Sequence, residues 1–101
     1  MTKERLKQYR FLKNELLELM GSSNTAASTE RIKAIQHEIS EIEAFINGLH
    51  NSELRQIFQY RSIQGLKWKA ISRKIYGYIS ADRPRNVATR YLERRNAHER
   101  A

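Results

Sequence analysis

The sequence predicts an all-α protein, with an antiparallel helical hairpin in residues 1–50 and a three-helix, helix-turn-helix bundle in residues 51–101. Apolar residues recur at three- and four-residue steps along most of the chain, which is the spacing of one helical face. No segment shows the alternating apolar and polar pattern of a strand. The four glycines all fall where one of these helices should end.

The first helix is expected to run to about Gly21. Its apolar positions are Leu6, Tyr9, Leu12, Leu16 and Leu19, and the stripe is expected to be widened by Phe11, Leu17 and Met20. Residues 21–28 are small and polar, which is typical of a flexible connection. Ser28 is the N-cap candidate of a second helix, with Glu30 in its first turn.

The second helix carries a regular isoleucine seam at steps of three and four residues, which indicates a heptad pattern. Its members are Ile32, Ile35, Ile39, Ile42 and Ile46. Such a seam needs a partner helix, and two partners remain open. The first helix can fold back within the chain, because a short connection costs little closure entropy. The second interpretation is that the seam also pairs between chains. We expect some self-association, with a homodimer as the default and a higher homo-oligomer as the alternative.

Residues 47–52 form a hinge, after which Ser52 is the N-cap candidate of a third helix. The apolar stripes of the last three helices are Leu54, Ile57 and Phe58, then Leu66, Trp68, Ile71 and Ile75, then Val87, Tyr91 and Leu92. Gly65 and Gly77 are placed for left-handed C-caps. The pattern leaves the start of the last helix open between Tyr76 and Pro84, with Ser80 or Asp82 as its cap.

The net charge lies entirely in the second half of the chain. Residues 1–50 contain seven basic and seven acidic side chains, whereas residues 51–101 contain twelve basic and four acidic ones, for a net charge of +8. A basic surface on a helix-turn-helix pattern is what neutralisation of backbone phosphates requires. The sequence therefore predicts a polyanionic partner, double-stranded DNA.

The segment from Leu54 to Val87 resembles the fourth conserved region of bacterial sigma factors. It is most similar to small phage-encoded regulators, the ArpU-like transcriptional regulators, whose pattern is hydrophobic-Arg-Tyr-x-x-Gly-x-x-Trp-x-x-Ile. Here Gly65, Trp68 and Ile71 match that pattern, and Tyr60-Arg61 stands near the Arg-Tyr pair in reversed order. The resemblance covers roughly the second half of the chain. It implies promoter-type DNA binding or contact with RNA polymerase.

The last helix is expected to be the recognition helix, because such a helix presents its N-terminal residues to base edges in the major groove. The base-reading candidates are Arg85, Asn86, Thr89 and Arg90; the phosphate-contacting candidates are Lys67, Lys69, Arg73, Lys74, Arg83, Arg94 and Arg95. Trp68 is expected to pack in the core. Tyr76 and Tyr78 stay open between contacting a phosphate and filling the underside of the turn.

No enzyme, metal site or cofactor is expected. The chain has no cysteine, and its three histidines are scattered. No apolar run approaches the roughly 20 residues of a membrane span, so the protein is expected to be soluble and intracellular. The resemblance to phage-encoded regulators implies the cytoplasm of a bacterial host cell. Two rival functions remain. The first is a DNA-packaging protein like a terminase small subunit, which ring formation would reveal. The second is a basic inhibitor of a host nucleic-acid-binding protein, which would bind that protein and not DNA.

Overall fold

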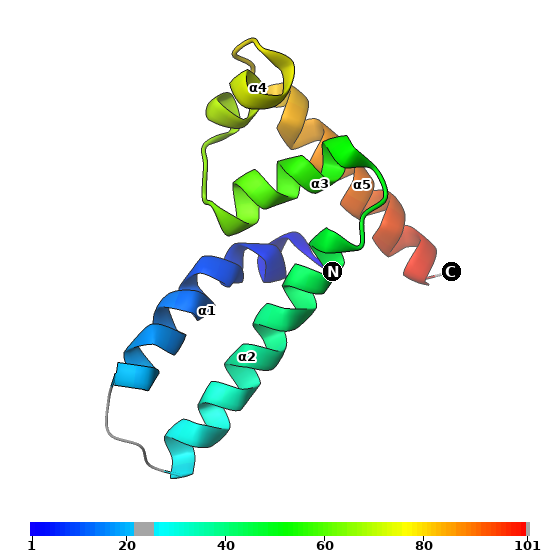
Figure 1. The fold of residues 1–101 in the computed structure, drawn as a ribbon. Coiled ribbons are helices and arrows are strands. Elements are labelled where there is room, and N and C mark those ends of the chain that lie inside the picture. Colours follow the sequence, from blue (N-terminus) through cyan, green and yellow to red (C-terminus); the bar gives the residue numbers. More distant parts are fainter. Residues whose placement is uncertain (22–25, 101) are drawn as a thin grey trace.

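The computed structural model describes residues 1–21 and 26–100, with the side chains of 26–28 and 99–100 left aside. It consists of α1 (Lys3–Gly21), α2 (Ala26–Asn47), α3 (Ser52–Phe58), the single π-helical turn η1 (Gln59–Ile63), α4 (Trp68–Tyr76) and α5 (Asp82–Arg100). These residues contain no strand, so the predicted all-α class is confirmed. Figure 1 shows an antiparallel hairpin of α1 and α2, with α3, α4 and α5 grouped at its open end.

The isoleucine seam of α2 is buried under α1 of the same chain. Ile35, Ile39, Ile42 and Ile46 are at most 5% exposed, and Ile32 at the start of the seam is partly exposed. Leu6 and Tyr9 of α1 belong to the same buried cluster. The first helix therefore folds back on the second, as the shorter-connection prediction required. The predicted widening of the α1 stripe is wrong, because Phe11, Leu17 and Met20 are exposed.

Charged side chains join the two helices along the flank of this seam. Arg5 of α1 donates to Glu38 of α2 at 2.7 Å and to Glu41 at 2.5 Å, and these two carboxylates raise the pKa of Arg5. Nearer the loop, Arg31 of α2 pairs with Glu15 of α1 at 3.0 Å. The Tyr9 hydroxyl donates to Glu43 at 3.0 Å. Three carboxylates of α2 are therefore bound by side chains of α1.

Two predicted N-caps are wrong. The second helix begins at Ala26, so Ser28 lies within it; residues 22–25 of the expected connection fall outside the described residues. The third helix is capped by Asn51 and not by Ser52. Asn51 has extended backbone angles, φ −77° and ψ 118°, so its side-chain oxygen reaches back to accept from the Leu54 N–H at 3.0 Å. Ser52 is already helical, and its hydroxyl accepts from Gln56 instead.

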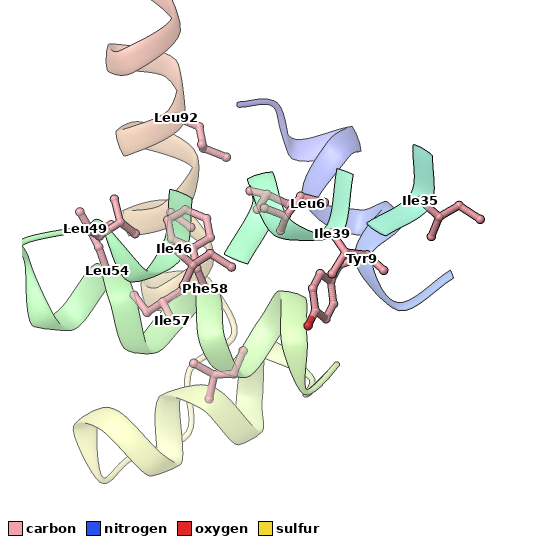
Figure 2. Close-up of a cluster of buried hydrophobic side chains, with 13 residues drawn as sticks. Leu6, Tyr9, Ile35, Ile39, Ile46, Leu49, Leu54, Ile57, Phe58 and Leu92 are labelled. Carbon is pink, nitrogen blue, oxygen red and sulfur yellow. The ribbon is translucent and has the colours of Figure 1, made fainter. Parts of the chain in front are cut away.

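A single hydrophobic core runs through both halves of the chain. Ile46 and Leu49, at the end of the hairpin, share one buried cluster with Ile57 and Phe58 of α3 and Leu92 of α5. Figure 2 shows Ile46 and Leu49 lying beside Leu54, Ile57 and Phe58. The ring of Phe45 in α2 also approaches Phe58 at 6.0 Å and Tyr91 at 6.4 Å between ring centres. Burial of these side chains fixes the bundle on the end of the hairpin.

The turn η1 changes which side chain of this segment faces the core. In an α-helix, the residue four positions after Ile57 and three after Phe58 would lie on the same face as both. That residue is Arg61. In η1 the Gln64 N–H bonds to the Gln59 carbonyl at 3.1 Å, five residues back, so each turn contains more residues. Ser62 is consequently the buried residue, 7% exposed, and Arg61 lies at the edge of the core.

The structure gives the first residue of each of the last two helices. The fourth helix starts at Trp68, and Leu66, predicted as part of its stripe, precedes it and bonds through its N–H to the Tyr60 carbonyl at 3.0 Å. The fifth starts at Asp82. Gly65 and Gly77 have φ of +72° and +81°, which confirms the predicted left-handed conformations. None of the described helices is both long and apolar enough to cross a bilayer.

Candidate nucleic-acid interface

The connection between α4 and α5 is held by hydrogen bonds from both helices. The Gly77 N–H donates to the Arg73 carbonyl at 3.1 Å, which ends α4. Ser72, fully buried, donates through its hydroxyl to the Tyr78 carbonyl at 2.7 Å. The Arg83 N–H reaches the Ser80 hydroxyl at 3.4 Å, and Pro84 is buried in the first turn of α5, where no N–H is needed. These contacts fix α5 relative to α4.

The outer face of α4 is cationic. Four of the predicted phosphate-contacting residues surround one shallow hollow of 510 Å³, which Ala70 and Ile79 complete; the four are Lys67, Lys69, Arg73 and Lys74. All four are exposed, and no carboxylate lines the hollow among the described residues. Lys74 also lies 5.7 Å from the centre of the Tyr60 ring. This face is therefore suited to anions.

The base-reading candidates spread over the outer surface of the first half of α5. Asn86 and Arg90 are exposed and make no hydrogen bond or ion pair with the residues that the structure describes. Arg85 is paired with Asp82 one turn earlier. Arg85 and Thr89 face a second hollow, toward α1. The four candidates thus cover one broad face, on which the side chains of Asn86 and Arg90, unpaired within the described part of the chain, are free to bind a ligand.

The remaining phosphate candidates are all exposed, and two of them also contact other side chains of the fold. Arg83 lies over the Tyr76 ring, 4.7 Å from its centre, and 3.8 Å from Glu53. The interaction with Tyr76 is the largest of the causes that raise the pKa of Arg83. Arg95 lies 5.0 Å from the centre of the Phe45 ring of α2 and 3.4 Å from the Tyr91 hydroxyl. Arg94 is exposed beside a further hollow near the C-terminus. Arg83 and Arg95 therefore pack against the scaffold.

The aromatic residues around the turn have structural partners. Tyr76 donates its hydroxyl to Glu53 of α3 and stacks on Tyr78 with ring centres 5.8 Å apart. Tyr78 remains 50% exposed. Trp68 packs against the core as predicted, and its outer side lies under the Arg61 guanidinium, 4.6 Å from the ring centre.

Sequence analysis missed a set of cations on α1. Lys3, Lys7 and Arg10 line the second hollow, of 490 Å³, together with Arg61 of η1 and Arg85 of α5. The balanced charge of residues 1–50 concealed this set, because the compensating carboxylates lie elsewhere. A signal was present in the spacing, since positions 3, 7 and 10 fall on one face of a helix.

The described residues contain no group of three or more histidine, aspartate or glutamate side chains placed to hold a metal ion. Comparison of the chain with protein-family models, with curated proteins and with solved structures finds no match in any of the three.

Proposed function

We propose that this protein binds double-stranded DNA through α4 and α5 and acts as a transcription regulator of phage or mobile-element type. The resemblance in the second half of the chain adds contact with RNA polymerase to the proposal. One observation carries it: the clustered Lys69, Arg73 and Lys74 of α4, with Lys67 at its N-cap, lie on a helix that a tightly bonded turn joins to α5. On α5 the side chains of Asn86 and Arg90 are exposed and unpaired among the described residues.

The proposed binding mode uses these two helices differently. The first half of α5 enters the major groove, where Asn86 can form a bidentate contact with adenine and Arg90 one with guanine. Lys69, Arg73 and their neighbours on α4 neutralise backbone phosphates and release counterions. Arg85 must exchange its partner Asp82 for a base. That exchange costs little, because an exposed ion pair is worth at most about 1 kcal/mol.

The experiment begins with selection of preferred duplexes from a random library, followed by affinity measurements on the selected site and on mixed-sequence DNA. Asn86→Ala and Arg90→Ala should each cost about 1–3 kcal/mol on the selected site and little on mixed DNA. Arg94→Ala is the matched control for Arg90→Ala, since the same side chain is removed one turn further along. It should weaken both complexes by a similar, smaller amount.

Two outcomes would contradict the proposal. Failure of the library to yield any enriched site, with no binding to mixed duplexes, would remove DNA as the partner. Equal losses for Arg90→Ala and Arg94→Ala on both DNAs would show that α5 is not the sequence reader.

A further inference from the structure

The cations of α1 are divided into two sets by their partners. Arg5 points to α2 and is paired with Glu38 and Glu41. Lys3, Lys7 and Arg10 lie on a different face of the helix, are exposed, and make no ion pair with the described part of the chain. The hairpin thus pairs Arg5 and leaves Lys3, Lys7 and Arg10 without an ion pair among the described residues, as it also leaves Lys13, which lies outside the hollow.

These three cations face the bundle. They line the 490 Å³ hollow with Arg61 and Arg85, and no carboxylate is among its described lining residues. The floor is apolar, formed by residues that include Leu6, Phe58 and Leu92. Arg10 is held close to the bundle, because its guanidinium lies directly against Gly65.

A recess that is lined by positive charges and has low-dielectric walls concentrates the electric field and attracts anions. The five cations come from three elements, so local pairing along a single helix does not explain the grouping. Arg85 and Thr89, candidates for reading bases, form one wall of the same recess. If α5 holds DNA, the backbone phosphates next to the contacted bases would therefore lie beside this recess, on the side of α5 that faces α1.

We infer that the N-terminal half of α1 is a second DNA-contacting element, in which Lys3, Lys7 and Arg10 bind backbone phosphates beside the groove occupied by α5. The inference rests on the proposed function. It gives the hairpin a part in binding DNA, beyond any part in assembly.

The salt dependence of binding to a mixed-sequence duplex tests this directly. Each phosphate contact contributes about −0.9 to the slope of log affinity against log salt concentration. The variant Lys7→Gln/Arg10→Gln should therefore reduce the slope by up to about 1.8, and the affinity at about 0.1 M salt by up to about 60-fold. Lys13→Gln/Lys33→Gln is the matched control, because it removes the same charge from exposed positions of the hairpin outside the recess. It should leave the slope unchanged.

A parallel variant of the proposed interface, Lys69→Gln/Arg73→Gln, separates the two possible failures. A reduced slope for this variant, with Lys7→Gln/Arg10→Gln equal to its control, would overturn the inference and leave the proposed function intact. Absence of salt-dependent DNA binding by the unmodified protein would overturn both. Helix content measured by circular dichroism checks that each variant is folded.

Position can be measured independently, because the chain has no cysteine of its own. Lys7→Cys and Lys33→Cys each provide one thiol for a short photo-crosslinking reagent. We expect Lys7→Cys to crosslink to duplex DNA and Lys33→Cys not to. Equal crosslinking from both positions would show that α1 has no specific place in the complex.

Discussion

Replacing Ile46 by alanine should destabilise the whole chain and not the hairpin alone. Ile46 is 0% exposed and belongs to the same core cluster as residues of α1, α3 and α5. An isoleucine-to-alanine change at a fully buried site costs about 2–5 kcal/mol, from lost transfer free energy and the cavity that remains. For a domain of this size, about 3 kcal/mol corresponds to a decrease in Tm of about 12–24 °C.

Two probes should report this change together. Far-ultraviolet circular dichroism follows all the helices, whereas fluorescence of Trp68, the single tryptophan, follows the bundle. Both should show one transition, shifted by the same amount in Ile46→Ala. Ile32→Ala is the matched control at the partly exposed end of the seam and should shift the midpoint much less. If the fluorescence midpoint stays at its original temperature while helix content falls earlier, the two halves do not share a core.

Two further predictions concern single positions. Gly77→Ala should cost about 1–2 kcal/mol in denaturant unfolding, because φ of +81° disfavours any side chain although no atom lies within 4 Å of the added Cβ; Gly21→Ala, equally open and without positive φ, should cost nothing, and equal losses would refute the conformational explanation. Burial and the bond to Glu43 raise the pKa of Tyr9 from 10.0 to about 12. The protonated form is therefore favoured by folding, so its contribution to stability is complete below pH 10 and is lost as the pH rises to 12. Tyr9→Phe should flatten the decrease in stability over this interval, and an unchanged pH profile would contradict the assignment.

The hairpin was predictable because its signal is repeated. Each isoleucine of the α2 seam reports the same face, and the low cost of a short connection favours α1 as its cover. Gly65 and Gly77 were similarly readable, since each position requires a conformation that suits glycine. These are features in which local preference and overall structure agree.

Other features depend on contacts between distant residues. Asn51 and Ser52 are both good caps, and only the backbone angles of the folded hinge select Asn51. Arg83 contacts Tyr76 and Glu53, from α4 and α3, and its place in the sequence does not reveal either partner. The grouping of Lys3 and Lys7 with Arg85 needs the packing of the hairpin against the bundle. The spacing of residues along the sequence does not predict how close these three side chains lie.

The wider turn at Gln59–Ile63 has a consequence for changes in chain length. With one residue fewer in this segment, the backbone could return to regular α-helical bonding, and the side chains after the deletion would rotate relative to Phe58. The Ser62 hydroxyl, which is buried in the core, would be displaced from it. The Arg61 guanidinium, which lies over Trp68, would move away from the edge of the recess. Substitutions on the exposed side of η1 should therefore be tolerated far better than a single deletion. In this protein the extra residue in one turn of the backbone places the charge of Arg61 at the surface and not in the core.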